Sequence, residues 1–103
     1  MEIYLLRHGI AEESTLALRD SERRLTPKGK TKLRDVLDRA RRSGVKPTLI
    51  LSSPLVRARE TADIAAEILG CRDGIVETES LVPGSTPERV WSEIREHRDV
   101  EQV

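Results

Sequence analysis

Short, mainly apolar runs alternate along the chain with longer segments whose apolar residues recur every three or four positions. Residues 3–6 and 48–51 form runs too short for helices of their own, and residues 74–78 form a third. Such runs are typical of strands buried on both faces of a parallel sheet. The repeated order of strand and helix therefore predicts an α/β domain with three α/β/α layers and a mainly parallel sheet.

Three segments that follow these strands carry the same helix-start pattern, a hydroxyl residue directly before a proline. The pairs are Thr26-Pro27, Ser53-Pro54 and Thr86-Pro87. A hydroxyl side chain at the N-cap and proline in the first turn are both typical of helix N-termini. The stripes that we expect to face the core are Leu33, Val36, Leu37 and Ala40, then Ala58, Ala62, Ala65 and Leu69, and last Val90, Trp91 and Ile94. Gly44 and Gly70 are expected to end the first two helices.

The first strand stops abruptly at Arg7-His8-Gly9. Ligands of open α/β sheets bind at the carboxyl ends of the strands, so these residues are candidates for a site. Arg7 offers a planar, permanently charged fork that suits phosphate. His8 offers a neutral nitrogen near pH 7, which can act as a base or a nucleophile. Gly9 allows the backbone to turn and a ligand to approach closely.

The second predicted helix begins at the same edge of the sheet. Arg57 falls in its first turn, where free N–H groups and the positive end of the helix dipole already favour an anion. Residues 10–22 are polar and are expected to form a loop beside this edge. Together these features predict an anion pocket that holds one candidate nucleophile, His8.

Composition limits the remaining classes of function. A chain of 103 residues makes a single domain over residues 1–103. Its 18 basic residues balance 18 acidic ones and its aromatic content is 2%, which disfavours a nucleic-acid-binding module. Cys71 is the only cysteine, so no internal disulfide and no zinc cluster is expected. The absence of an apolar leader or a spanning run predicts a cytoplasmic protein without a membrane partner.

Several of these motifs resemble those of one family. Residues 5–9, Leu-Leu-Arg-His-Gly, resemble the signature of the histidine phosphatase superfamily, the phosphoglycerate mutase-like enzymes. Residues 53–61, Ser-Pro-Leu-Val-Arg-Ala-Arg-Glu-Thr, resemble its second motif. The pattern Arg-x-Leu-Thr-x-x-Gly at 23–29 and the turn at 81–84 resemble the SixA-type branch, the phosphohistidine phosphatases. The resemblance covers nearly the whole chain and implies the phosphoglycerate mutase-like fold without its C-terminal strands.

The resemblance also implies a mechanism that needs no metal ion or other cofactor. His8 would attack the phosphorus atom and carry a transient phosphoryl group, which water then removes. Arg7 and Arg57 would clamp the equatorial oxygens, where charge must be held during transfer. Gly9 and Arg23 would add contacts to the phosphate or the substrate.

The family pattern includes a second histidine after a later strand, in a Gly-His-x-Pro-like segment. His97 is the only other histidine here and lies in the third predicted helix, so that role is not transferred to it. Because the chain ends at Val103, we expect either a portion of a longer protein or a natural short form. The missing strand would lie beside the first strand and leave an unpaired edge. Glu79 is a weaker candidate for the general acid, or else an exposed carboxylate at a strand end.

Two of the candidate arginines also have plainer interpretations. Arg57 could pair with Glu60 or Asp63 on its own helix. Arg23 could form a solvated pair with Arg24 before the first helix.

Three functions remain open after this reasoning. The first is a phosphatase acting on a phosphohistidine protein, such as a signalling histidine phosphotransfer domain. No long insertion is present to form a lid over a small metabolite, which favours a protein substrate. The second is a small-molecule phosphomonoesterase of the same superfamily. The third is a catalytically inactive domain that binds phosphate or a partner, motivated by the missing second histidine.

Overall fold

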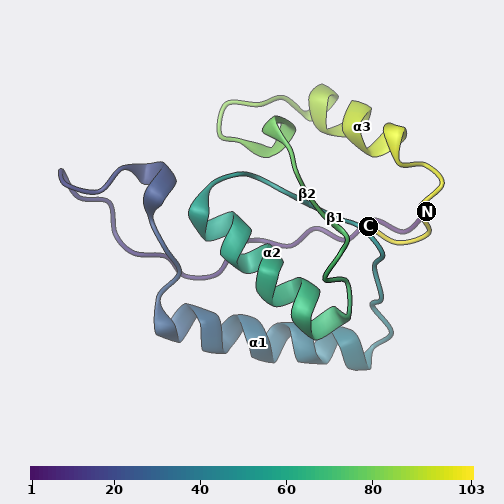
Figure 1. The fold of residues 1–103 in the computed structure, drawn as a ribbon, viewed down its shortest axis with the longest axis horizontal. Coiled ribbons are helices and arrows are strands. Elements are labelled where there is room, and N and C mark those ends of the chain that lie inside the picture. Colours follow the sequence, from purple (N-terminus) through teal and green to yellow (C-terminus); the bar gives the residue numbers. More distant parts are fainter.

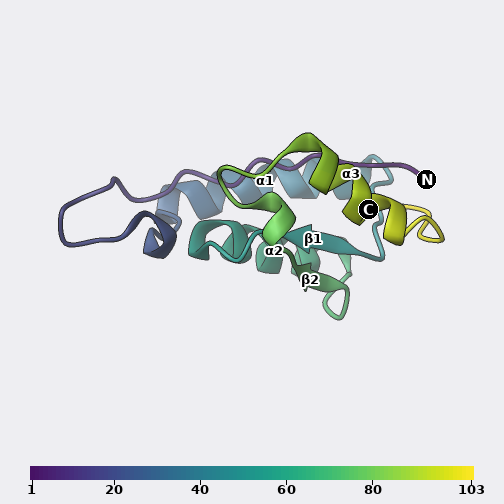
Figure 2. The same ribbon diagram turned by 90° about the horizontal axis from the view of Figure 1, so that it is seen from above.

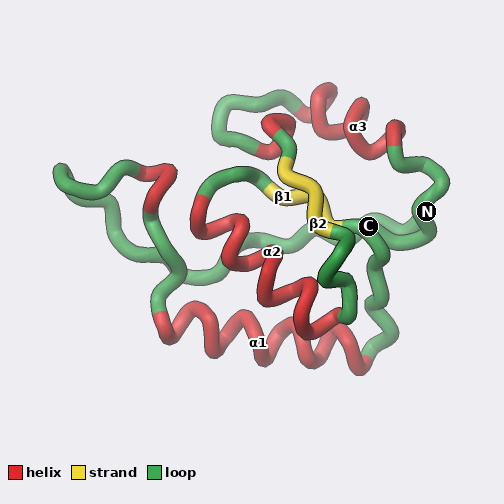
Figure 3. The backbone as a smooth tube through the Cα atoms, in the orientation of Figure 1, coloured by secondary structure: helices red, strands yellow, loops and turns green.

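Helices and strands alternate along the chain in the computed structural model, which describes residues 1–103 (Figures 1 and 3). The elements are η1 (Asp20–Glu22), α1 (Pro27–Arg42), β1 (Ile50–Ser52), α2 (Val56–Leu69), β2 (Ile75–Glu77), η2 (Glu79–Leu81) and α3 (Pro87–Glu96), where η marks a short 3-10 helix. None of the helices combines the length and apolar character that a membrane span requires.

The two strands form a parallel pair, with α2 as the connection between them. Ile50 lies opposite Ile75 and Ser52 lies opposite Glu77. The helices α1 and α2 lie on one side of the strands and α3 on the other (Figure 1). The prediction of an α/β fold with a parallel sheet is therefore confirmed, and the loop after Ser52 leaves from the carboxyl edge of β1.

The first predicted strand is not part of this sheet. Residues 3–6 run in an extended path that passes above β1 (Figure 2), and Leu5 is 92% exposed. Their backbone pairs instead with the end of the chain. Tyr4 donates to the carbonyl of Val103 at 2.8 Å, and Val103 donates to the carbonyl of Glu2 at 3.0 Å. The expectation of a strand buried on both faces was wrong, because residues 3–6 are exposed and line a cavity that separates them from β1 on its opposite wall.

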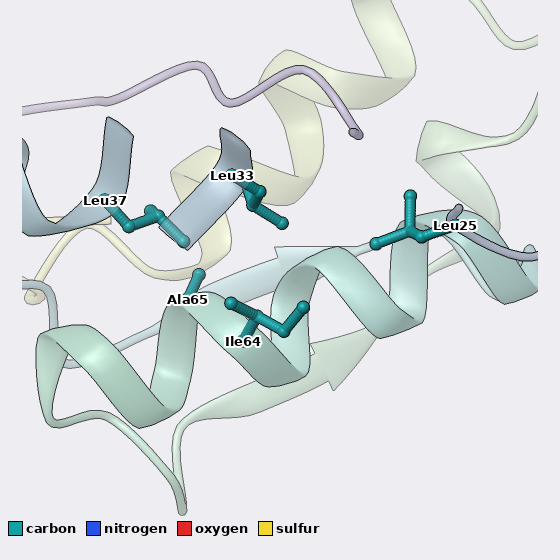
Figure 4. Close-up of a cluster of buried hydrophobic side chains, with 5 residues drawn as sticks. All are labelled: Leu25, Leu33, Leu37, Ile64 and Ala65. Atoms are coloured by element: carbon teal, nitrogen blue, oxygen red, sulfur yellow. The ribbon is translucent and has the colours of Figure 1, made fainter. Parts of the chain in front are cut away.

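The core lies between α1 and α2 (Figure 4). Its buried members are Leu25, Leu33, Leu37, Ile64 and Ala65. Small residues on α2 allow α1 to approach closely, and burial of the leucines and the isoleucine stabilises the pair by roughly 1.5–3 kcal/mol per fully buried side chain.

Two residues of the predicted stripes lie outside the core. Val36 is 52% exposed because it sits at the outer margin of the α1 stripe, and Trp91 is 51% exposed. On α3 the inward positions belong to Val90 and Ile94, which line a cavity and do not pack on β1. The expectation that Trp91 belongs to the core was wrong for this reason.

The N-terminal caps of α1 and α3 are formed as predicted. Thr26 Oγ1 accepts the Gly29 N–H at 2.9 Å, and Thr86 Oγ1 accepts the Arg89 N–H at 3.3 Å. Both threonines precede a proline in the first helical position. Each cap satisfies one N–H group that has no partner within the helix, which is worth about 1 kcal/mol.

Gly29 allows the backbone of Ile10 to cross directly over the first turn of α1. A Cβ at this position would overlap the Ile10 carbonyl oxygen. Gly29→Ala is therefore expected to lower the free energy of unfolding, measured by urea denaturation, by about 1–3 kcal/mol. Lys32→Ala on the exposed face of the same helix is the control and should change it little. Stabilisation by Gly29→Ala, the usual result of replacing a helical glycine, would contradict the close approach.

Candidate active site

The segment that carries His8 is anchored to α2 through Thr61. The Gly9 N–H donates to Thr61 Oγ1 at 3.3 Å, and the Thr61 hydroxyl donates to the Arg57 carbonyl oxygen at 2.8 Å. Thr61 is only 4% exposed; its bond to the Arg57 carbonyl is buried, and the bond from Gly9 is partly buried. One buried hydroxyl thus joins the His8-Gly9 segment to the first turn of α2.

The imidazole of His8 is exposed and oriented by its own neighbour. Its Nδ1 lies 2.8 Å from the Gly9 carbonyl oxygen. A carbonyl oxygen can only accept, so the contact requires the tautomer with the proton on Nδ1. The lone pair then lies on Nε2, on the other side of the ring, where it is available to attack an electrophile or to accept a proton.

The N-terminus of α2 has no side-chain cap. Leu55 occupies the N-cap position, and the helix begins at Val56. The sequence predicted Ser53 as the N-cap residue, and this was wrong, because the helix begins two residues later than that cap requires. Ser53 Oγ accepts the Leu55 N–H at 3.2 Å instead. The helix therefore presents uncapped N–H groups beside Arg57, which lies in its first turn as expected, and both features favour an anion.

Arg57 and Arg23 converge on one carboxylate, that of Asp20 in η1. Arg57 is 8% exposed; its Nη1 donates to the Asp20 carbonyl oxygen at 2.7 Å and its Nη2 to Asp20 Oδ2 at 3.2 Å. Arg23 Nη1 donates to Asp20 Oδ1 at 2.8 Å, and its Nε donates to the Glu12 carbonyl oxygen at 2.6 Å. The structure thus brings two predicted phosphate ligands to a single oxyanion.

The plainer interpretations of these arginines do not hold. Glu60 pairs with Lys30 at 3.5 Å, and Asp63 pairs with Arg59 at 3.1 Å, so neither takes Arg57. Arg23 pairs with Asp20, and its side chain is only 21% exposed. It therefore does not form a solvated pair with Arg24.

The arginines set the protonation state of Asp20. The hydrogen bond from Arg23, together with the hydrogen bond and charge of Arg57, lowers the pKa of the Asp20 carboxyl against a smaller opposing effect of desolvation. The carboxylate is therefore charged throughout the neutral range. Arg57 Nε is buried and has no hydrogen-bond partner, which leaves one donor of this guanidinium unsatisfied.

Arg7 and His8 line a cavity of about 390 Å³ between the N-terminal segment, β1, α2 and α3. The walls of the cavity are mainly apolar. Ser53 is one of the few other polar residues that line it. Arg7 is exposed and takes part in none of the ion pairs, so its guanidinium has no internal anion.

Glu79 is not brought together with the other candidates. It is the first residue of η2, is exposed, and forms no hydrogen bond with Arg7, His8 or Arg57. The cavity that Arg7 and His8 line includes the next residue, Ser80, but not Glu79, and it does not include Arg23 or Arg57 either.

Sequence reasoning did not single out Asp20 or Thr61. Both leave a signal in hindsight: Asp20 stands three residues before Arg23, and Thr61 stands one helical turn after Arg57, on the same face of α2. Spacing within one element cannot show that Asp20 and Arg57, which are 37 residues apart in the chain, are in contact.

Thr61→Val is expected to lower the free energy of unfolding by about 1–3 kcal/mol, because the part-buried Gly9 N–H loses its acceptor. Urea denaturation measures the loss. Thr61→Ser keeps the hydroxyl and should restore most of it. A loss in Thr61→Ser without a loss in Thr61→Val would show that the methyl group, and not the hydrogen bond, is what matters.

The chain is similar to known proteins along most of its length. The model of the histidine phosphatase superfamily (branch 1) matches residues 3–97. An uncharacterized protein of Picosynechococcus is 46% identical over 66 residues, which cover 64% of this chain and 40% of that protein. The probable phosphoglycerate mutase GpmB of Escherichia coli O1:K1 is 33% identical over an alignment of 106 positions, gaps included, which covers 88% of this chain and 47% of that protein.

Solved structures share the fold. The putative phosphohistidine phosphatase SixA from Agrobacterium tumefaciens superposes with a TM-score of 0.85 and is 28% identical; the match covers 98% of this chain and 66% of that one. The protein histidine phosphatase SixA complexed with tungstate superposes with a TM-score of 0.90 and is 24% identical; the match covers 100% of this chain and 66% of that one. The chain thus spans less than half of the two curated relatives and 66% of these two structures. On the family match over residues 3–97, together with the fold, the chain belongs to the histidine phosphatase superfamily (branch 1).

Proposed function

We propose that this site removes the phosphoryl group from a phosphohistidine protein through a covalent intermediate on His8. The observation that carries the proposal is the convergence of Arg23 and Arg57 on one carboxylate. Arg57 lies on α2, the helix whose Thr61 anchors the His8-Gly9 segment. Two guanidinium groups, an uncapped helix N-terminus and a nucleophilic nitrogen are the parts that phosphoryl transfer needs.

In the first step, His8 Nε2 attacks the phosphorus atom. A new N–P bond forms, the bond to the substrate imidazole breaks, and that imidazole leaves with a proton from the solvent. In the second step, water attacks the phosphoryl group on His8, the N–P bond breaks, and inorganic phosphate and neutral His8 are released. Donation from the ring Nδ1–H to the Gly9 carbonyl keeps Nε2 as the atom that attacks in the first step and leaves in the second.

Charge on the equatorial oxygens is held by arginines in this mechanism. Arg57 supplies it from a buried position beside the N-terminus of α2, and Arg23 from the loop before α1. Arg7, next to the nucleophile and without an internal anion, supplies a third guanidinium. This positive charge makes a metal ion unnecessary for binding the phosphoryl group.

A protein substrate is favoured by two observations. The His8 side chain is exposed, so a phosphorylated side chain on another protein can reach it. The solved structures with this fold include the putative phosphohistidine phosphatase SixA from Agrobacterium tumefaciens and a protein histidine phosphatase SixA. A leaving imidazole is also readily protonated, which reduces the need for a general acid such as Glu79.

A small-molecule phosphomonoesterase is the second candidate, favoured by the 33% identity to the probable phosphoglycerate mutase GpmB. The two are separated by measuring phosphate release from a phosphorylated histidine phosphotransfer domain and from a sugar phosphate. We expect a higher kcat/KM for the phosphoprotein. Turnover of the sugar phosphate alone would favour the second candidate. Phosphate binding without any turnover would favour a non-catalytic binding domain.

A further inference from the structure

We propose that the Asp20 carboxylate is an internal competitor that occupies the arginine pair until the phosphoryl group of the substrate displaces it. The inference rests on the proposed function, because it concerns the same anion site. In this inference Asp20 determines how tightly an anion must bind in order to displace it from Arg23 and Arg57.

The carboxylate reproduces the contacts of a phosphoryl group. Oδ1 accepts from Arg23 and Oδ2 accepts from Arg57, so each guanidinium holds one oxygen of the same anion. Two equatorial oxygens of a phosphoryl group offer the same pair of acceptors with more negative charge. Both anions need the same donors, so they cannot occupy the pair together.

Of the partners, Asp20 is the one that can leave. Its side chain is 55% exposed, whereas the Arg57 side chain is only 9% exposed. A carboxylate that swings into water regains its hydration at little cost, but a buried guanidinium left without an anion does not. The unpartnered Nε of Arg57 gives an incoming anion an additional donor.

The loop that carries Asp20 is closed at its base, so Asp20 can move without unfolding the site. Ala11 and Leu25 form an antiparallel bridge, and the Glu12 N–H donates to the Arg24 carbonyl at 2.8 Å. Glu60 on α2 accepts the Leu25 N–H at 2.9 Å, which fixes this base to the helix of Arg57. Beyond the base, the loop projects from the body of the molecule (Figure 1).

Asp20→Asn separates charge from structure. The main-chain carbonyl of residue 20 still accepts from Arg57 Nη1 in this variant, so the loop keeps one of its contacts. The side chain loses the negative charge that competes with phosphate and one of its two acceptor oxygens. Asp20→Glu keeps that charge and serves as the rescue variant.

The test is the affinity for inorganic phosphate, measured by isothermal titration calorimetry. If Asp20 occupies the pair for most of the time, Asp20→Asn should bind phosphate roughly 3- to 10-fold more tightly than the wild type, because the competent fraction rises. Asp20→Glu should lie closer to the wild type. Asp38→Asn is the matched control: Asp38 is held by Arg41 at 2.8 Å and Arg42 at 3.0 Å on the outer face of α1, and its loss should leave phosphate affinity unchanged.

Each remaining outcome decides against the inference. Equal or weaker phosphate binding by Asp20→Asn would show that Asp20 orients the arginines and does not compete, while the proposed function would stand. If neither the wild type nor Asp20→Asn bound phosphate, the anion site itself would be overturned, and with it both proposals.

Discussion

His8→Ala is expected to abolish release of phosphate from a phosphohistidine protein, with a fall in kcat/KM of at least ~10³. The reason is that the variant keeps the arginines and the helix terminus but has no nitrogen to form the N–P bond. His8 is exposed, and its ring bonds only to the neighbouring Gly9 carbonyl, so the fold should survive the substitution. Phosphate release measured in the steady state gives the ratio directly.

His97→Ala is the matched control for this prediction. His97 is the other histidine of the chain, lies at the C-terminal end of α3, and faces Glu93 at 3.9 Å. Its removal should leave phosphate release unchanged. If His97→Ala lost as much activity as His8→Ala, the loss in His8→Ala would no longer identify His8 as the nucleophile.

Arg57→Ala is expected to lower kcat/KM by about 10²–10³, the usual effect of removing one charged contact to a transition state. Arg57→Lys restores the charge but not the planar fork, so it should recover only part of the loss. Because Arg57 is buried and paired with Asp20, the free energy of unfolding must be measured alongside the rate. The proposal requires that the rate falls even where the variant remains fully folded.

Arg59→Ala is the control on the same helix. Arg59 is 39% exposed and pairs with Asp63 and Glu77, away from the anion site. Its loss should change the rate little. Equal losses in the Arg57 and Arg59 variants would indicate a general effect of positive charge on α2, and the specific clamp would then be wrong.

The features predicted correctly from the sequence are local ones. The caps of α1 and α3 join residues three positions apart, and the stripe of α1 follows a helical period, so Thr26, Thr86, Leu33 and Leu37 could be assigned without a structure. The parallel pairing of β1 and β2 follows from the helix between them, because a connection of this kind returns the chain in the same direction.

The features missed depend on partners that are distant in the sequence. Residues 3–6 have the composition of a buried strand, but their backbone pairs with residues 101–103 and not with β1. The anion site shows the same limit. The roles of Arg57 and Arg23 follow from motifs, whereas the carboxylate of Asp20 between them is set by the path of a loop that no local pattern specifies.

The most direct test of the account is to locate the phosphoryl group during turnover. The chain would be mixed with a phosphorylated histidine phosphotransfer domain, quenched in alkali within milliseconds to preserve phosphohistidine, and analysed by peptide mass spectrometry. The account predicts a transient phosphate on His8, absent from His8→Ala and reduced in Arg57→Ala. Turnover with the phosphate on another residue, or with no covalent intermediate at any time point, would contradict it.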